Sequence, residues 1–206
     1  MAESDLPLGD RFRWAEEIFV QSKLLMTKFQ IQEIVSGLSA QISQDLGVLY
    51  PVVLSIMRGS LMFSGDLMRC LGFPLDFDYF DVSVYRNSTS PGDVRWNLTP
   101  RTVLDGRHVL LIDDILDHGV TLQAVCEWLS EQNVKSIRVA VLCERKINNC
   151  DPKIRADYIG FNIHGSSFVF GYGMDIYGFW RNLPALYSYD SSAVTVSKVE
   201  KSSESG

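Results

Sequence analysis

Three aspartates that follow an apolar run form the pattern with the clearest chemical meaning in this 206-residue chain. The run 109–112 is apolar throughout and has the character of a strand buried on both faces. The segment after it contains Asp113, Asp114, Asp117, His118, Gly119, Val120 and Thr121. An amphipathic stretch with few helix breakers comes next, so the pattern predicts a strand, a loop and the first turn of a helix.

This arrangement suits a phosphorylated sugar. Ligands of an open parallel sheet bind beyond the carboxyl ends of its strands, where a helix start offers free backbone N–H groups to an anion. Gly119 lets the backbone approach the ligand, and the Thr121 hydroxyl adds a donor. The three carboxylates would repel a phosphate unless a divalent cation or sugar hydroxyls offset their charge. A phosphorylated ribose with Mg²⁺ meets both conditions, whereas the alternative is an ordinary turn with aspartate caps.

The run from Leu111 to Thr121 resembles the phosphoribosyl-diphosphate signature of type I phosphoribosyltransferases, and most of all that of their hypoxanthine-guanine branch. The resemblance implies that Asp113 and Asp114 accept hydrogen bonds from the ribose, and that Asp117 is the catalytic acid/base at the purine N7. The backbone of 118–121 and the Thr121 hydroxyl would hold the phosphate. His118 stands where the family more often has Ser or Thr, and Val120 stands where many relatives have Lys.

A second match to this family covers 168–184, where an aromatic residue and a valine precede the sequence G-Y-G-M-D and an aromatic stretch. The resemblance implies that Phe168 stacks on the base and that the Val169 backbone contacts the base edge. By the same resemblance Asp175 holds Mg²⁺, directly or through water, and Arg181 reaches the diphosphate. Taken alone, the segment also fits a glycine-rich aromatic hairpin.

Two further segments are assigned by the same resemblance. The apolar run 51–57 ends in Arg58 and Gly59, which predicts a second strand–glycine–helix turn and a diphosphate contact. The family has a cis peptide here, which would be Met57–Arg58. The polar cluster after Tyr85 corresponds to the flexible loop that closes over the site, with Tyr85 as its candidate substrate contact, although the family's usual Ser-Tyr pair is only partly present.

Two adjacent cations, Arg145 and Lys146, follow Glu144 at the end of the apolar run 136–143, where the family has a lysine that binds the exocyclic oxygen of a 6-oxopurine. Adjacent residues of a strand face opposite ways, so only one of them easily points into a pocket. If residues are counted forward from Asp117 along the family pattern, Arg145 falls at the position of the family's lysine. If they are counted back from the next strand, Lys146 falls there. We predict Lys146, since a one-residue insertion is easily absorbed in the preceding loop.

Periodicity and length indicate the architecture. Apolar spacing over 30–46 predicts an amphipathic helix, and the buried runs predict parallel strands. We expect a single α/β domain over 1–190, with a central, mostly parallel sheet flanked by helices on both faces, the type I phosphoribosyltransferase fold. A small hood would be built from 1–30 and 157–189, and the Ser-, Lys- and Glu-rich segment 191–206 is expected to be a disordered tail.

Composition limits the partners. The formal net charge of −6 argues against a nucleic-acid binder. The four cysteines form no C-x-x-C pair, and no signal-like N-terminus or membrane-length apolar run is present, so we expect a cytoplasmic protein with no membrane partner. The resemblance implies a homodimer or homotetramer.

The implied function is transfer of the 5-phosphoribosyl group from phosphoribosyl diphosphate to N9 of a 6-oxopurine. Hypoxanthine would give IMP and guanine would give GMP, with release of diphosphate, in purine salvage. Two alternatives stay open: a catalytically weak or silent nucleotide-binding relative that acts through protein partners, and an RNA-binding regulator on the same fold.

Overall fold

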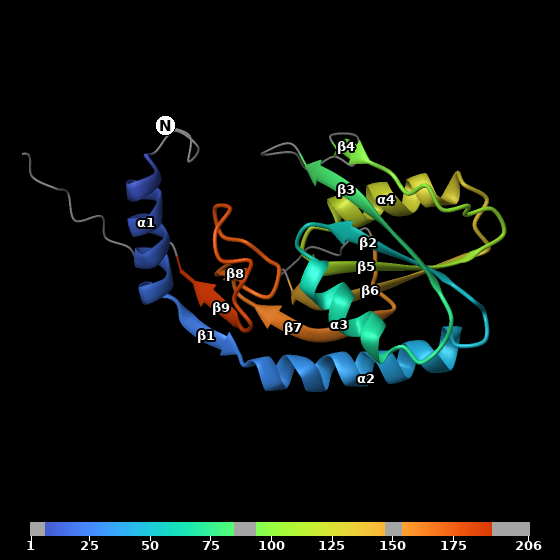
Figure 1. Ribbon diagram of the computed structural model, residues 1–206, viewed down its shortest axis with the longest axis horizontal. Helices are drawn as coiled ribbons and strands as arrows, with labels where there is room; N and C mark the ends of the chain where they lie inside the picture. Colours follow the sequence, from blue (N-terminus) through green and yellow to red (C-terminus); the bar gives the residue numbers. More distant parts are fainter. Residues whose placement is uncertain (1–6, 85–93, 147–153, 191–206) are drawn as a thin grey trace, which may run out of the picture.

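The computed structural model describes residues 7–84, 94–146 and 154–190. It contains two sheets and the helices that pack on them (Figure 1). The elements are α1 (Leu8–Gln21), β1 (Lys23–Met26), α2 (Lys28–Leu46), β2 (Val52–Met57), α3 (Leu61–Cys70), β3 (Asp76–Val84), β4 (Val94–Leu98), β5 (His108–Leu116), α4 (Val120–Ser130), β6 (Ser136–Lys146), β7 (Tyr158–His164), β8 (Phe168–Phe170) and β9 (Leu186–Tyr189).

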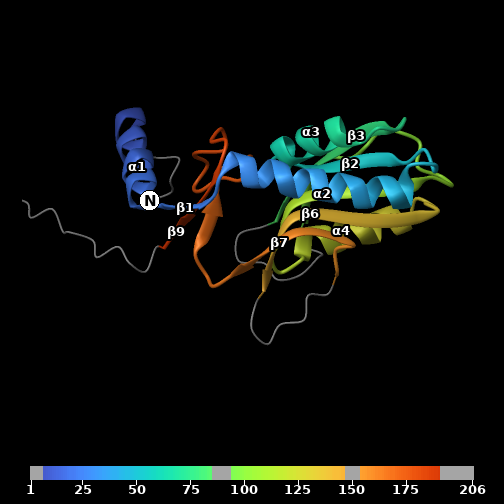
Figure 2. The ribbon, with the colours of Figure 1, turned by 90° about the horizontal axis from the view of Figure 1, so that it is seen from below.

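The larger sheet has the strand order β4-β3-β2-β5-β6-β7, and every neighbouring pair is parallel except β3 with β4. Its central strands β2, β5 and β6 are mostly buried on both faces, because helices cover each side of the sheet (Figure 2). Alternate residues of one strand therefore enter different cores: Leu110 packs with α2 and α3, and Leu111 packs with α4. The predicted mostly parallel sheet with helices on both faces is confirmed.

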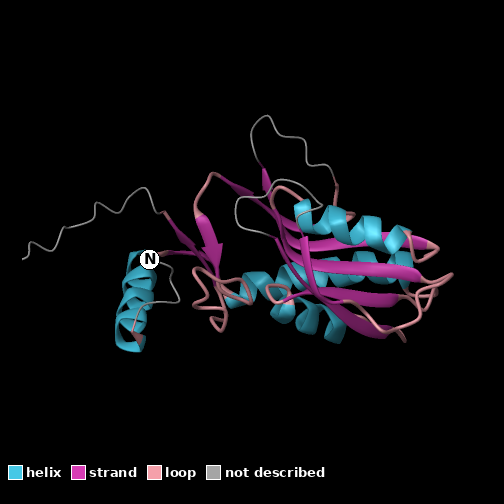
Figure 3. Cartoon of the chain, turned by 90° about the horizontal axis from the view of Figure 1, so that it is seen from above, coloured by secondary structure: helices cyan, strands magenta, loops and turns pink. Residues whose placement is uncertain are grey.

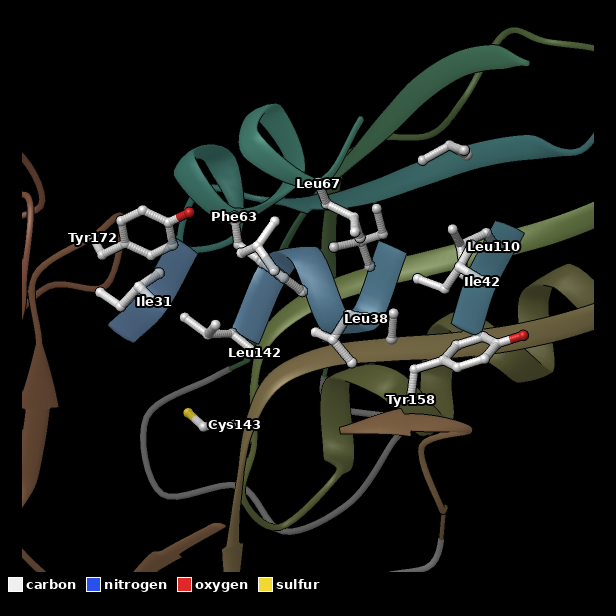
Figure 4. Close-up of a cluster of buried hydrophobic side chains, with 14 of the residues drawn as sticks. Ile31, Leu38, Ile42, Phe63, Leu67, Leu110, Leu142, Cys143, Tyr158 and Tyr172 are labelled. Atoms are coloured by element: carbon white, nitrogen blue, oxygen red, sulfur yellow. The ribbon is translucent and has the colours of Figure 1, made fainter. Parts of the chain in front are cut away.

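The core under α2 shows why the helix forms where its sequence predicts. Ile31, Leu38 and Ile42 recur at helical spacing and point toward the sheet, where they meet side chains of α3 and of the central strands (Figure 4). The helix begins with a capping box, in which the Thr27 hydroxyl accepts from the Gln30 N–H and the Gln30 side chain accepts from the Thr27 N–H.

The smaller sheet, β1-β9-β8, lies with α1 at one end of the molecule and forms the hood (Figure 3). Two expectations need correction. The hood does not begin at 157, because β7 pairs with β6 and completes the larger sheet. Asp113 and Asp114 do not lie in a loop, because β5 continues to pair with β6 as far as Leu116. None of the described helices combines the length and apolar character needed to span a membrane.

Candidate active site

The carboxyl ends of β2, β5 and β6 meet at one edge of the larger sheet, because these three strands are parallel neighbours. The turns that follow β2 and β5 contain the glycine-bearing segments that the sequence singled out, and the Met57–Arg58 peptide between β2 and α3 is cis, as predicted. This edge is where ligands of such sheets bind.

The acidic segment and the start of α4 enclose a cavity of about 360 Å³. Gly119 is the N-cap of α4 and has a φ of +74°, a left-handed conformation that glycine adopts without strain. The first N–H groups of a helix have no acceptor within it, so the turn at Val120 and Thr121 presents donors to this cavity. The described residues that line it are Ile56, Met57, Gly59, Val82, Asp113, Asp114, Ile115, Asp117, His118, Gly119, Val120, Thr121 and Leu122. The expected grouping of the three aspartates around a helix start is therefore present.

Asp113 and Asp114 are adjacent carboxyl groups near the end of β5. Asp113 is buried, and its Oδ1 accepts the Asp114 N–H at 3.0 Å. Burial and the adjacent Asp114 carboxylate raise the pKa of Asp113 well above its ordinary value of 3.8. Burial also raises the pKa of Asp114, although hydrogen bonds from Asp113 and the Ile115 N–H, and to a smaller extent the Arg181 cation, partly offset this effect. The pair places carboxyl oxygens where water solvates them poorly, and such oxygens are suited to accept hydrogen bonds from donors such as sugar hydroxyls.

The raised pKa of Asp113 predicts how Asp113→Asn alters stability. At pH values above the ordinary pKa of 3.8, Asp113 keeps its proton in the folded protein and loses it in the unfolded protein. The free energy of unfolding of the wild type therefore falls as the pH rises through this range. Asparagine carries no such charge, and we expect Asp113→Asn to be the more stable protein at neutral pH. The two proteins should converge near pH 4 or below.

Thermal unfolding of both proteins from pH 4 to 8 measures this difference. A wild type whose stability rises steadily over this range relative to the variant would contradict the assigned direction.

Glycines allow three segments to meet at the pair. A Cβ on Gly59 would lie 1.9 Å from Asp114 Oδ2, and a Cβ on Gly173 would lie 2.1 Å from the Gly59 carbonyl oxygen. Below this contact, the Ser55 hydroxyl hydrogen-bonds those of Ser60 and Ser64, each at 2.7 Å. The turn after β2 is therefore held both by buried hydroxyl groups and by packing against the Gly173 segment. The sequence reading missed this serine cluster, because it appears only when β2 packs on α3.

Asp117 lies at the junction of two cavities. It lines the first cavity and also a second one of about 580 Å³, whose described lining is Asp117, His118, Arg145, Lys146, Gly165, Ser166, Ser167 and Phe168. Its Oδ2 is 3.4 Å from Arg145 Nε, and its buried Oδ1 has no hydrogen-bond partner in the described structure. The His118 Nε2 lies 4.0 Å from this Oδ1. Gly165, Ser166 and Ser167 were missed by the sequence reading, although their position just before Phe168 was the available signal.

The two cations at the end of β6 differ in their partners. Arg145 is mostly buried, contacts Asp117 and donates from Nη1 to the Gly165 carbonyl at 2.7 Å. Lys146 pairs instead with the buried carboxylate of Glu144, two residues earlier on the strand. Both side chains line the 580 Å³ cavity. Phe168 is half-exposed at its rim, and Val169 is buried.

Asp175 and Arg181 face one another across a turn of the hood. Arg181 donates to Asp175 Oδ1 at 2.6 Å and to the Gly173 carbonyl at 2.8 Å, while the Gly178 N–H donates to Asp175 Oδ2 at 2.7 Å. Arg181 also lines a third cavity, of about 350 Å³, together with the exposed Arg58. Because Gly173 packs on the Gly59 turn, this hood segment adjoins the acidic edge of the sheet.

The donor set fits Mg²⁺ supplied together with a substrate. Among the described residues, no three His, Cys, Asp or Glu side chains gather as a metal site. Mg²⁺ characteristically takes one or two carboxylates and completes its coordination with water and substrate phosphates. Asp175 is partly exposed, and a carboxylate whose two oxygens each accept one hydrogen bond still has free lone pairs. Tyr85 lies outside the described residues, so its predicted contact stays a prediction.

Comparison with known proteins now identifies the family. A model of the phosphoribosyl transferase domain matches residues 27–177. The chain belongs to the phosphoribosyltransferase family. It is 35% identical over 163 residues to the hypoxanthine-guanine phosphoribosyltransferase of Bacillus subtilis, which covers 79% of this chain and 89% of that protein. It is 30% identical over 173 residues to the hypoxanthine-guanine-xanthine phosphoribosyltransferase of Tritrichomonas foetus, which covers 84% of this chain and 94% of that one.

Solved structures agree with the sequence relatives. The crystal structure of a hypoxanthine phosphoribosyltransferase from Staphylococcus aureus superposes with a TM-score of 0.76 at 34% identity, and covers 82% of this chain and 92% of that one. Both the resemblance to the hypoxanthine-guanine branch and the type I phosphoribosyltransferase fold are confirmed. Helix α1 precedes the part of this phosphoribosyltransferase that the family model matches.

Proposed function

We propose that the protein transfers the 5-phosphoribosyl group of phosphoribosyl diphosphate to N9 of hypoxanthine or guanine, which yields IMP or GMP and diphosphate, in purine salvage. One observation carries the proposal: Asp117 lines both the 360 Å³ cavity at the start of α4 and the 580 Å³ cavity beside Phe168. A glycosidic bond between a sugar and a base forms where their two binding sites meet. Asp117, a carboxylate whose Oδ1 has no hydrogen-bond partner in the described structure, would lie at this junction.

Each cavity suits one reactant. In the first, the N–H groups at the start of α4 and the Thr121 hydroxyl would bind the 5′-phosphate, while Asp113 and Asp114 accept from the ribose hydroxyls. In the second, Phe168 would stack on the flat base, and backbone groups of Val169 would meet its edge. The similarity to hypoxanthine-guanine and hypoxanthine-guanine-xanthine phosphoribosyltransferases supports this division between a sugar phosphate and a 6-oxopurine.

The reaction is mainly a problem of charge. As the bond to the leaving group lengthens, negative charge grows on the diphosphate and positive charge grows at C1′ of the ribose. Arg58 and Arg181 would stabilise the diphosphate, and bound Mg²⁺, held by Asp175 and the substrate, would supply further electrostatic stabilisation there. Asp117 would accept or share the N7 proton of the purine through its unpartnered Oδ1, which makes N9 the better nucleophile.

The test is conversion of radiolabelled hypoxanthine, guanine and xanthine by the purified protein, with and without Mg²⁺. We expect Mg²⁺-dependent formation of IMP and GMP, and the xanthine measurement shows whether the broader specificity named for the Tritrichomonas relative extends to this chain. No turnover of any base would favour a silent nucleotide-binding relative. Retention of all three aspartates around one cavity speaks against that alternative and against an RNA-binding role.

Lys146 stays our predicted reader of the C6 oxygen, with Arg145 as the alternative that lies nearer to Asp117. An ammonium donates and cannot accept, so it selects an oxo group over an amino group. A charged hydrogen bond contributes about 1.5–3 kcal/mol, so Lys146→Gln should raise the KM for hypoxanthine and guanine by about 10- to 100-fold. Arg145→Gln is the matched comparison, and a rise in base KM confined to that variant would transfer the role to Arg145.

We also propose that the protein acts in the cytoplasm as a homodimer or homotetramer. The described cysteines Cys70, Cys126 and Cys143 are free thiols, which suits a reducing compartment. Large apolar side chains on α3 and β3, among them Leu61 and Phe77, are exposed and offer surface to a second copy. Light scattering of the full chain during size-exclusion chromatography measures the assembly directly.

A further inference from the structure

Helix α1 lies outside the part of the chain that the family model matches, yet it packs against the hood turn that contains Asp175 and Arg181. The Trp14 ring stacks on Tyr177, with centroids 4.9 Å apart, and meets Phe179 edge-on at 5.6 Å. The Trp180 indole N–H donates to the Ala15 carbonyl at 2.7 Å. Figure 1 shows α1 on the side of the hood that faces away from the larger sheet.

These contacts involve the residues of the turn that have an unfavourable backbone conformation. Ile176 and Phe179 pair as a two-residue hairpin, and its central residues Tyr177 and Gly178 have φ values of +53° and +81°. Trp180 also has a positive φ, of +64°. Glycine adopts this conformation readily, whereas Tyr177 and Trp180 do so at a cost. Helix α1 contacts both of these non-glycine residues, one through stacking and one through a hydrogen bond.

This hairpin determines where the side chains of Asp175 and Arg181 lie. The Gly178 N–H, at the tip, donates to Asp175 Oδ2, and Arg181 follows Trp180 directly. Arg181 then pairs with Asp175 and contacts the Gly173 carbonyl next to the Gly59 turn. A shift of the hairpin would therefore displace the carboxylate and the guanidinium together.

We propose that Trp14 is a positioning residue of the active site: through Tyr177 it holds the 175–181 turn in the conformation that presents Asp175 and Arg181 to Mg²⁺ and diphosphate. This inference rests on the proposed function, because it assumes that these two side chains meet the diphosphate. Trp14 itself lines none of the three cavities described above. Its effect should appear mainly in binding of phosphoribosyl diphosphate, because the side chains that meet the base cavity beside Arg145 contact Trp14 only through Tyr177.

The first measurement is hydrogen exchange of the ligand-free protein, wild type against Trp14→Ala. An aromatic stack shifts a local opening equilibrium by about two- to tenfold, and we expect amides of 176–183 to exchange faster by that factor. Peptides from β5 serve as the internal reference and should not change.

The second measurement is calorimetric binding of phosphoribosyl diphosphate with Mg²⁺, where misplacement of the turn should weaken the Kd by about 10- to 100-fold. The KM for hypoxanthine should change less than this Kd, because Trp14 reaches the base cavity only through Tyr177, whose ring centroid is 6.0 Å from that of Phe168.

Three further variants make the result decisive. Trp14→Phe keeps an aromatic ring against Tyr177 and should restore most of the binding. Trp180→Phe removes only the indole donor to Ala15 and tests the same link if Trp14→Ala folds poorly. Phe12→Ala, on α1 but 68% exposed, is the matched control and should behave as wild type.

The outcomes separate the inference from the proposed function. Wild-type protein that binds phosphoribosyl diphosphate, together with Trp14→Ala that binds it equally well, would overturn the positioning role even if exchange in the turn increases. Equal loss in Phe12→Ala would overturn it as well, because the effect would then be general destabilisation of α1. Wild-type protein that neither binds nor consumes phosphoribosyl diphosphate would contradict the proposed function instead.

Discussion

Asp117→Asn is expected to lower kcat by about 10²- to 10⁴-fold, the range that general acid–base catalysis commonly contributes. Asparagine has nearly the same shape and still offers an oxygen to Arg145 Nε, which lies 3.4 Å from Asp117 Oδ2. The asparagine side chain cannot take up the N7 proton of the purine, because an amide is not basic near neutral pH. The loss should therefore fall on kcat far more than on binding of phosphoribosyl diphosphate.

Steady-state turnover with hypoxanthine and calorimetric binding of phosphoribosyl diphosphate measure the two quantities. Asp105→Asn is a suitable control, because it makes the same change of charge at an exposed residue that precedes β5, away from the edge where the cavities lie. Turnover within about twofold of wild type would remove Asp117 from the mechanism.

Gly59→Ala is expected to disrupt the site without any change of charge. The added Cβ would lie 1.9 Å from Asp114 Oδ2 and 2.6 Å from its Cγ, so the carboxylate must move. The Gly59 backbone cannot simply retreat, because its carbonyl already packs on Gly173. We expect a loss of about 10²-fold in kcat/KM for phosphoribosyl diphosphate, the effect of a misplacement near 1 Å, and a destabilisation of about 1–3 kcal/mol from overpacking.

Gly65→Ala is the matched control in the next helix. Nothing lies within 4 Å of a Cβ at Gly65, and alanine is the better helix former, so this variant should keep full activity and gain about 0.5–1 kcal/mol of stability. Denaturant unfolding and initial-rate kinetics on both variants test the pair. Equal activity of the two proteins would show that Asp114 can move without consequence, and would contradict its assigned contact with the ribose.

The sequence by itself determined the centre of this site, because its parts are close neighbours in the chain. Asp113, Asp114, Asp117 and Gly119 lie within seven consecutive residues at the junction of β5 and α4. Local rules are sufficient there: an apolar run predicts the buried strand, a glycine predicts the turn, and a helix start predicts the anion-binding amides. The order of strands and helices, and with it the parallel sheet, follows from the same periodicities.

Other features were decided only by the tertiary structure. The orientation of Arg145 and Lys146 depends on the register of β6 against β5, and a shift of one residue exchanges the faces of a strand, so counting from either side of the loop gave different answers. The continuation of β5 through Asp113 and Asp114 likewise required β6 as its partner, and the assignment of β7 to the larger sheet required pairing with β6.

The contacts between distant segments are the clearest case. Gly59 meets Gly173, and Trp14 meets Tyr177, across more than one hundred residues of chain in each case. No local pattern in the sequence specifies which surfaces of the hood and of the sheet meet, because such packing depends on the shapes of side chains that come together only after folding. The sequence thus predicted which groups gather at the site, and the tertiary structure decided how they are held.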